Sequence, residues 1–154
     1  MAMICFDSGD ARFNYRVAGI ALRDNQVLLN RLDSHWFLPG GRVEMGETSG
    51  EALQREMREE IQEDVQVGRL LWIAESFFDG VEQKCYHELG LYYLMTLAPD
   101  ASIACTTEPL ATLDGSTFQW FSLTELDTIT LYPPFLVEGL RKLPEQTVHI
   151  LDGR

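Results

Sequence analysis

Four glutamates share one arc of a predicted helix and could together hold a metal ion; they are Glu56, Glu59, Glu60 and Glu63. Pairs spaced three or four residues apart repel, so the set costs the helix on the order of 1–2 kcal/mol. A bound divalent cation would turn that repulsion into shared attraction, because Mg²⁺ and Mn²⁺ prefer carboxylate, carbonyl and water oxygens. The plainer alternative is a solvated acidic face on a surface helix.

The loop before this helix favours the metal interpretation. Gly40 and Gly41 free the backbone for a close approach, and a carbonyl of either could join the carboxylates as a hard oxygen ligand. An EF-hand is excluded, because the chain has no D-x-[DN]-x-[DN]-G spacing. A cation here would neutralise pyrophosphate oxygens and lower the pKa of a bound water, which is the chemistry of metal-assisted hydrolysis.

The stretch from Gly41 to Glu60 resembles the signature of the Nudix (MutT-like) hydrolase family. That signature runs Gly, five residues, Glu, seven residues, Arg-Glu, an apolar residue, any residue and Glu-Glu, then any residue, Gly and an apolar residue. The residues in register with it are Gly41, Glu47, Arg55, Glu56, Met57, Glu59 and Glu60. The lead-in "WFLPGG" and the later "FQWFSLTEL" also look like the family.

The resemblance implies an α/β fold, an α/β/α sandwich around a mixed β-sheet, with residues 1–154 as a single domain. It also implies Mg²⁺-dependent (or Mn²⁺-dependent) hydrolysis of a nucleoside diphosphate linked to another moiety. Matched by position, Glu56 and Glu60 look like direct metal ligands, and Glu59 looks like a ligand or the base that activates water. A carbonyl of Gly40 or Gly41 would add to the ligand set.

Two further features of the signature region concern the ends of the helix. Glu47 and Arg55 look like an ion pair that ties the loop to the helix and orients the catalytic site. Where the family has Gly and an apolar residue after the Glu-Glu pair, this chain has Gln62 and Glu63. Gly there would end the helix in a left-handed conformation. Gln62 makes that turn harder, which predicts a helix that runs on toward Val65 or ends differently.

Outside the signature, Glu88 is the preferred further catalytic carboxylate, because a lone acid in an apolar strand needs a partner. Glu108, by default a solvated loop residue, is the alternative, and His87 is interpreted as an ordinary strand histidine. The arginines that could contact phosphates are Arg16, Arg31 and Arg42. The aromatic residues that could stack a base, although each also suits a core, are Trp36, Phe37, Phe77, Phe78 and Tyr86.

Strand signals occur on both sides of the acidic helix. Residues 15–32 indicate two strands around the turn "RDNQ". Long β-rich runs at 65–78 and 81–97 are joined at Asp79-Gly80, a hairpin dipeptide. A loop over 98–116 then leads to a short strand, "TFQWFSL".

Helix signals place the acids. Residues 48–62 form the best helix of the chain, with Thr48 as N-cap and Glu51 completing a capping box. Ser122 and Glu125 form a second such box, which predicts a short helix after it. The pair of prolines in "PPFLVEGLRKL" opens the last predicted helix, which stops before the next proline.

Composition narrows the class of protein. The chain has 154 residues, 45% hydrophobic and 23% charged, which is typical of one ordinary globular domain. Its net charge is −12, so unassisted binding to a nucleic-acid backbone is not expected. If the ligand is phosphorylated, a metal or a local arginine cluster must offset the repulsion. We expect a small nucleotide as the partner, and the sequence leaves a homodimer open.

The cysteines and the N-terminus favour a cytoplasmic protein. Cys5, Cys85 and Cys105 are far apart and in no metal-binding spacing, so we interpret them as reduced structural thiols. The first residues lack the basic start and apolar run of a signal peptide. No apolar stretch approaches the roughly 20 residues that span a membrane, so no membrane association is expected.

Three functions compete on this sequence. The first is a Mg²⁺-dependent Nudix pyrophosphohydrolase acting on a nucleoside triphosphate or a nucleotide sugar, since the downstream proline of ADP-ribose-specific relatives is missing before Pro99. The second is a non-catalytic Nudix-like nucleotide-binding domain, favoured if Gln62 displaces the helix end. The third, a Nudix-fold isomerase, would need a nucleophilic cysteine near the metal, and nothing marks one.

Overall fold

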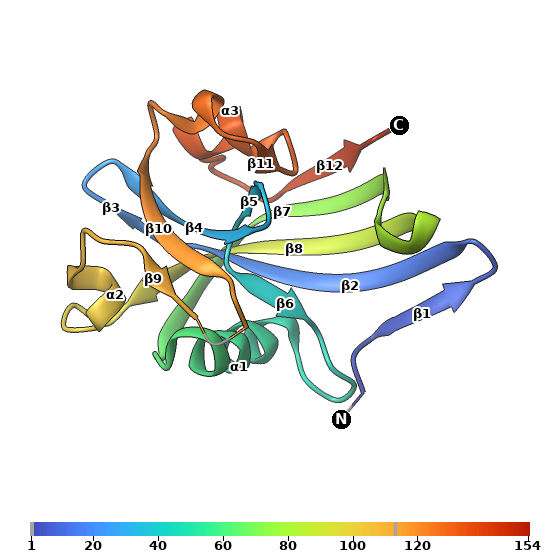
Figure 1. The fold of residues 1–154 in the computed structure, drawn as a ribbon, viewed down its shortest axis with the longest axis horizontal. Helices are drawn as coiled ribbons and strands as arrows, with labels where there is room; N and C mark the ends of the chain where they lie inside the picture. Colours follow the sequence, from blue (N-terminus) through green and yellow to red (C-terminus); the bar gives the residue numbers. More distant parts are fainter. Residues whose placement is uncertain (1, 113) are drawn as a thin grey trace.

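A mixed six-stranded sheet runs through the middle of the protein (Figure 1). The computed structural model describes residues 2–112 and 114–154. Five strands of the sheet lie in the order β1 (Cys5–Ser8), β2 (Ala11–Ile20), β8 (Cys85–Leu97), β7 (Val65–Asp79) and β12 (Val148–Asp152), and β6 (Gly40–Arg42) also pairs with β2. The pairs β2–β8 and β7–β12 are parallel and the others antiparallel.

A second sheet packs beside the first. It follows the order β11 (Leu131–Tyr132), β5 (His35–Phe37), β4 (Gln26–Leu32), β10 (Thr117–Ser122) and β9 (Leu110–Ala111), and β3 (Leu22–Arg23) also pairs with β4. Its longest pairing, β4 with β10, is antiparallel. Buried residues of β4 alternate between the two hydrophobic clusters of the core: Val27 and Leu29 belong to one, and Leu28 belongs to the other.

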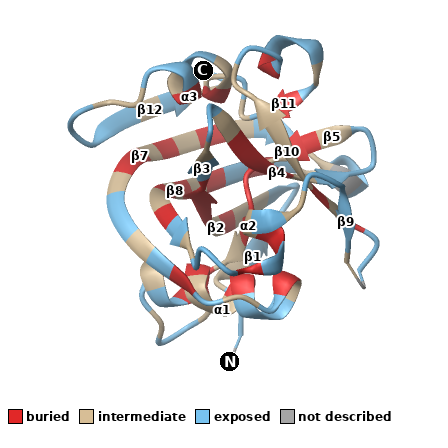
Figure 2. Ribbon diagram, turned by 90° about the vertical axis from the view of Figure 1, so that its left-hand side faces the viewer, coloured by how far each residue is buried: buried red, intermediate tan, exposed pale blue. Residues whose placement is uncertain are grey.

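Helix α1 (Ser49–Ile61) covers one face of the central sheet, against β2, β6 and β7. Its buried apolar side chains are Ala52, Leu53, Met57 and Ile61, on one side of the helix. The predicted capping box is confirmed: the Glu51 amide donates to Thr48 Oγ1 at 3.2 Å, and the Thr48 amide donates to Glu51 Oε2 at 2.7 Å. Figure 2 shows the buried segments of α1 and the alternation of burial along β7.

The opposite face of the sheet carries α3 (Leu136–Arg141). Neighbouring residues of β2 point to opposite faces, so Val17 packs in the cluster of α1 while Ala18 packs with Leu136 and Leu140 of α3. The expected α/β/α arrangement around a mixed sheet is therefore confirmed. The other helical segments are α2 (Ser102–Cys105) and two 3₁₀ turns, η1 (Val81–Gln83) and η2 (Leu126–Thr128).

The end of α1 differs from the expectation for a chain without glycine there. Gln62 itself adopts the left-handed conformation (φ 58°, ψ 33°), and the helix stops at Ile61 rather than running toward Val65. The Gln62 amide donates to the Arg58 carbonyl at 3.1 Å, and the Glu63 amide donates to the Met57 carbonyl at 3.4 Å. These bonds satisfy the terminal carbonyls as a glycine cap would, at the cost of placing a side chain in a disfavoured backbone region.

Several other local predictions need correction. β7 and β8 are joined by residues 80–84 containing η1, because the Gly80 amide pairs with the Lys84 carbonyl and closes a longer loop than the predicted two-residue turn. The predicted box at Ser122 and Glu125 does not form; Glu125 makes no side-chain capping bond, and a single 3₁₀ turn follows. The predicted loop 98–116 contains α2 and β9. The strands β1, β5, β6, β11 and β12 also lie outside the predicted strands.

Candidate active site

Glu56 is nearly buried, with 9% of its surface exposed, and its carboxyl group lies against the backbone of Gly41. A Cβ added to Gly41 would sit 2.2 Å from Glu56 Cδ, so only glycine leaves room for the carboxylate there. Gly40 is equally constrained, because a Cβ there would meet the Val17 carbonyl oxygen at 2.0 Å. The two glycines thus bring strand β6 close to both β2 and the acidic face of α1.

Arg55 gathers the carboxylates of this region around one guanidinium. It donates to both oxygens of Glu47, at 3.0 and 2.7 Å, and to the Arg42 carbonyl at 2.9 Å. Its Nη1 also donates to Glu56 Oε1 at 3.0 Å and to Glu59 Oε2 at 3.3 Å. These bonds to Arg55 hold the pKa of Glu47 below its usual range. The predicted pair of Glu47 and Arg55 is therefore present and fixes the loop against the helix.

Glu60 has a buried carboxylate oxygen, Oε2, without a hydrogen-bond partner in the structure. Burial, followed by the charge of Glu56, raises the pKa of Glu60 to about 8. Burial also raises the pKa of Glu56, although the hydrogen bond from Arg55 opposes that rise. Two desolvated carboxylates beside a close backbone approach are a donor set that suits a hard divalent cation. The residues present therefore fit the implied metal ion.

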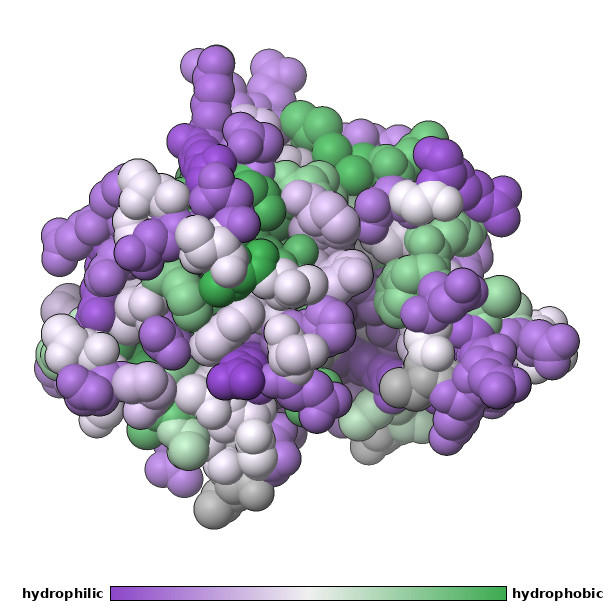
Figure 3. All heavy atoms as spheres, turned by 45° about the horizontal axis from the view of Figure 1, so that its top comes forward, coloured by the Kyte–Doolittle hydropathy of each residue, from purple (hydrophilic) through white to green (hydrophobic). Residues whose placement is uncertain are grey.

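The protein also has a pocket of about 700 Å³. Its walls include Arg16, Phe37, Phe77, Phe78, Glu88 and Tyr132. Arg16 connects the pocket to the acidic helix, because its positive charge acts on both Glu56 and Glu60. The face of the molecule in Figure 3 mixes hydrophobic and hydrophilic side chains and is hollowed to the right of its centre.

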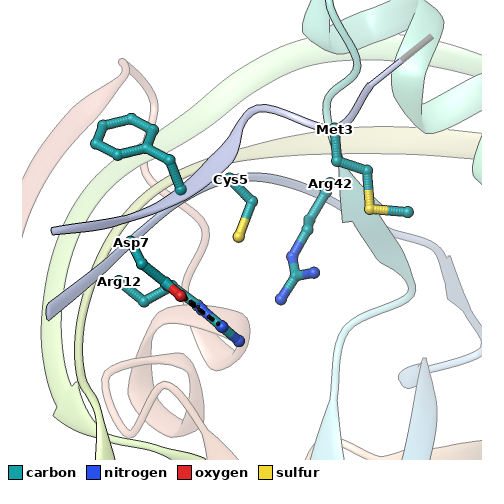
Figure 4. A pocket seen from close by; sticks show the side chains of 6 residues that line it. Met3, Cys5, Asp7, Arg12 and Arg42 are labelled. Carbon is teal, nitrogen blue, oxygen red and sulfur yellow. Dashed lines mark hydrogen bonds and ion pairs between the residues drawn. The ribbon is translucent and has the colours of Figure 1, made fainter. Parts of the chain in front are cut away.

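A second, more open pocket of about 530 Å³ lies where β1 and β2 meet β6. Figure 4 shows Arg42 pointing into it opposite Cys5, with Arg12 paired to Asp7 at 2.7 Å. Arg42 Nε also donates to Asn14 Oδ1 at 2.6 Å, and Asn14 Nδ2 donates to Glu88 Oε2 at 2.5 Å. A hydrogen-bonded chain therefore joins the two pockets.

The structure unites some predicted site residues and separates others. The network of Arg55 includes Glu47, Glu56 and Glu59, whereas Glu88 bonds Asn14 in the pocket instead. Within residues 2–112 and 114–154, no three His, Cys, Asp or Glu side chains are already arranged as metal ligands. The roles assigned to these residues remain predictions.

Only some of the other candidate residues for phosphate binding, base stacking and catalysis line the pocket. Arg16, Phe37, Phe77 and Phe78 line the pocket of about 700 Å³, whereas Trp36 and Tyr86 are core residues. Arg31 lies at the surface, where it donates to the Asp33 carbonyl at 2.8 Å. His87 is exposed and stacks on Phe77, and Glu108 is exposed with its amide bonded to Thr106.

Sequence reasoning missed Asn14, Asp114 and Asp152. Asp114 acts electrostatically on Glu60 from the loop before β10, and Asp152 lines the pocket of about 700 Å³ from β12. Asn14 precedes Arg16 in the alternation of β2, which was the available signal, but its partner Glu88 is far away in sequence. No helix in the described part of the chain is long and apolar enough to cross a membrane.

Comparison with known proteins agrees with this arrangement. A family model described as the NUDIX domain matches residues 13–143. YjhB of Bacillus subtilis (strain 168), provisionally named an ADP-ribose pyrophosphatase, is 36% identical over 84 residues, which cover 53% of this chain and 38% of that protein. This chain therefore spans less than half the length of that relative.

Solved structures resemble the chain as well. An ADP-ribose pyrophosphatase from Streptococcus suis 89-1591 gives a TM-score of 0.58 at 18% identity, over 90% of this chain and 98% of that one. A MutT Nudix hydrolase from Burkholderia pseudomallei gives a TM-score of 0.61 at 22% identity, over 81% of this chain and 95% of that one. At these identities the structures support the fold alone. Because the family model spans most of the sequence, this chain belongs to the Nudix family.

Proposed function

We propose that the protein hydrolyses the pyrophosphate bond of a nucleoside diphosphate linked to another moiety, with a divalent cation. The buried, unpartnered oxygen of Glu60 is the observation on which this proposal rests, together with Glu56, which acts electrostatically on Glu60 and lies against Gly41. A pure binding domain would gain nothing from two desolvated carboxylates whose charges oppose each other. A bound cation would stabilise both.

The carboxylates of Glu56 and Glu60 and a carbonyl of Gly40 or Gly41 would hold Mg²⁺ or Mn²⁺. When bound, the cation supplies charge neutralisation for the pyrophosphate and a lower pKa for a coordinated water. Glu59 is 59% exposed at its side chain, so it can reach a substrate as a further ligand or as the base that takes a proton from water. Its hydrogen bond from Arg55 limits its orientation.

Charged side chains outside the helix would position the phosphates. Arg16 lines the pocket and lies close enough to Glu60 to influence it, so its guanidinium can bind an oxygen of the diphosphate. Arg55 already bonds two carboxylates and a carbonyl, so its role is to orient Glu47, Glu56 and the loop. Glu88, the further catalytic candidate, bonds Asn14 and lines the pocket rather than joining the Arg55 network, so its proposed role is in substrate binding.

The substrate class is proposed at two levels. The general class is a nucleotide with a pyrophosphate bond, and the finer assignment is a nucleoside triphosphate or a nucleotide sugar. The name of YjhB adds ADP-ribose to the substrates that must be tested. The alternative of a non-catalytic domain depended on a displaced helix end, and Gln62 instead ends the helix in the left-handed conformation that glycine would adopt.

The test is phosphate release from nucleoside triphosphates, dinucleotides, ADP-ribose and nucleotide sugars, with Mg²⁺, Mn²⁺ or chelator and with coupling enzymes. We expect cation-dependent turnover of one class and its loss, by at least about a hundredfold, in Glu60→Gln. Glu138→Gln, at an exposed carboxylate of α3, is the matched control and should retain the activity. Turnover in chelator, or an active Glu60→Gln, would refute the proposal.

A further inference from the structure

A row of polar side chains crosses the floor of the pocket of about 700 Å³. Asn14 on β2 pairs in register with Glu88 on β8, Glu88 pairs with Ser76 on β7, and Ser76 pairs with Asp152 on β12. Residues paired in register project to the same face of a sheet, so the four side chains form one continuous row. Glu88, Ser76 and Asp152 line the pocket, and Asn14 is bonded to Glu88.

Burial of this polar row lowers the stability of the folded protein. Ser76, Asn14 and Glu88 are 2%, 4% and 8% exposed, and they are three of the six buried polar residues in the described chain. Buried polar groups, and carboxylates above all, destabilise a protein unless they are bonded. Apolar residues would pack this part of the sheet at lower cost, so a ligand that uses these groups accounts for them better than packing does.

The chain of hydrogen bonds holds Glu88 in one orientation. Asn14 Nδ2 donates to one carboxylate oxygen of Glu88, Oε2, and the other end of the Asn14 amide accepts from Arg42 Nε at 2.6 Å. Asn14 is therefore a positioning residue. Glu88 retains acceptor capacity for a ligand in the pocket, because a carboxylate accepts about four hydrogen bonds.

Aromatic rings flank the row and shape the pocket. Phe37 and Tyr132 stack with centroids 6.3 Å apart and planes at 27°, on the side of β5 and β11. Phe78 also lines the pocket, and its ring stacks on Tyr86 with centroids 5.1 Å apart. Such surfaces suit a flat, unsaturated ring better than a pyranose or a phosphate.

The charges of the lining distinguish the two ends of a nucleotide. Four acids line the pocket, Asp33, Asp79, Glu88 and Asp152, against a single arginine, Arg16. Phosphates would therefore gather at Arg16, whose charge also acts on Glu56 and Glu60 of the acidic helix. The remaining acceptors suit a group that presents hydrogen-bond donors.

We propose that this pocket binds a nucleobase with an exocyclic amino group, which donates to Glu88. The inference deepens the proposed function, since it assigns the base half of the same substrate. Adenine, cytosine and guanine carry such an amino group, whereas uracil and hypoxanthine present a carbonyl oxygen at the corresponding position of cytosine and adenine. A carbonyl oxygen facing the Glu88 carboxylate would leave two acceptors opposed and unpaired.

The test measures binding separately from hydrolysis. Isothermal titration calorimetry with Mg²⁺ compares CMP with UMP and AMP with IMP, two pairs in which a carbonyl replaces the amino group. We expect the amino-bearing member of each pair to bind about ten- to a hundredfold more tightly, since a hydrogen bond to a charged acceptor is gained. Glu88→Gln, which offers an amide that can also donate, should reduce the preference at least about tenfold.

Glu75→Gln is the matched control, because Glu75 is on the same strand as Ser76 but points to the other face and bonds His149. It should leave both preferences unchanged. Equal binding within each pair, no measurable binding of any monophosphate, or an unaltered preference in Glu88→Gln would overturn the inference. A uniform fall in kcat with unchanged binding would also overturn it, by placing Glu88 in the hydrolytic step.

The inference and the proposed function fail in different ways. If nucleotides were hydrolysed and bound equally well with and without the amino group, the proposed pyrophosphohydrolase activity would be supported and the assignment of the base pocket refuted. If the protein bound amino-bearing monophosphates selectively but hydrolysed no nucleotide with a cation, the assignment of the base pocket would be supported and the proposed enzymatic activity refuted.

Discussion

Replacing Glu60 with glutamine should stabilise the protein in the absence of a divalent cation. Burial and the charge of Glu56 raise the pKa of Glu60 to about 8 from an ordinary value of 4.5. At pH 7 the folded protein must therefore take up a proton that the unfolded chain does not hold. At about 1.4 kcal/mol per pH unit, that uptake costs the fold about 3 kcal/mol. Glutamine needs no proton and avoids this cost.

The sign of the pH dependence follows from the same shift. The folded-state pKa of Glu60 lies above the unfolded-state value, so protonation of Glu60 favours the folded state. Its full contribution to the free energy of unfolding is present below pH 4.5 and is lost as the pH rises toward 8. Chelated wild-type protein should lose stability across that window. Chelated Glu60→Gln should have a flatter profile.

The assay is urea unfolding in chelator from pH 5 to pH 8, repeated with Mg²⁺ or Mn²⁺. The figure of about 3 kcal/mol is an upper bound because part of the side chain remains near water, and a shift of half that size would suffice. Cation at a hundred times its dissociation constant should add about 2.7 kcal/mol to the wild type and far less to the variant. Glu59→Gln, at an exposed carboxylate, is the control for stability in chelator and should change it little. A chelated Glu60→Gln no more stable than wild type at pH 7 would refute the reasoning.

Three other substitutions probe the surroundings of these acids. Gly41→Ala should displace Glu56, whose carboxyl carbon lies 2.2 Å from the added Cβ, and the cation dependence of activity should shift to at least about tenfold higher concentrations. Arg55→Lys keeps the charge but loses the two parallel hydrogen bonds to the Glu47 carboxylate. Urea unfolding should therefore show a loss of about 1–3 kcal/mol in the free energy of unfolding. Gln62→Gly should stabilise the protein by about 0.5–1 kcal/mol in the same assay, because glycine accepts φ 58° without strain; a loss would show that the glutamine side chain has a compensating contact.

The local parts of the site could be predicted from the sequence because they lie on one helix and its preceding loop. Spacing on a helix fixes which side chains are neighbours, so the shared arc of Glu56, Glu59 and Glu60 follows from a short window. The capping box of Thr48 is local in the same way and formed as expected. Gln62 shows the limit of such rules: residue preference disfavours the left-handed conformation, yet Gln62 adopts it directly after Ile61, the last buried residue of α1.

The remaining parts depend on strand register between distant segments, which a single sequence does not reveal. β12 is only five residues long, its sequence VHILD does not alternate, and it pairs in parallel with the distant β7, so nothing nearby in the chain predicts it. The partnership of Asn14 with Glu88 requires the parallel pairing of β2 with β8 in one register. A shift of one residue would turn every side chain of that strand to the opposite face.

The two halves of the site are therefore encoded in different ways, and this bears on how its specificity can change. The acids that would hold the cation belong to a contiguous helix and loop, where Glu56 lies against Gly41 and accepts a hydrogen bond from Arg55. The polar row under the base pocket is assembled from four strands, and each of its members can change without altering α1. We therefore expect Glu88→Gln to alter base preference while leaving the cation-dependent gain in stability intact. Gly41→Ala should do the reverse, weakening that gain while leaving the ratio of CMP to UMP binding unchanged. If each variant altered both quantities to the same extent, the cation site and the base pocket would be one coupled unit, and the separate roles argued from their geometry would be wrong.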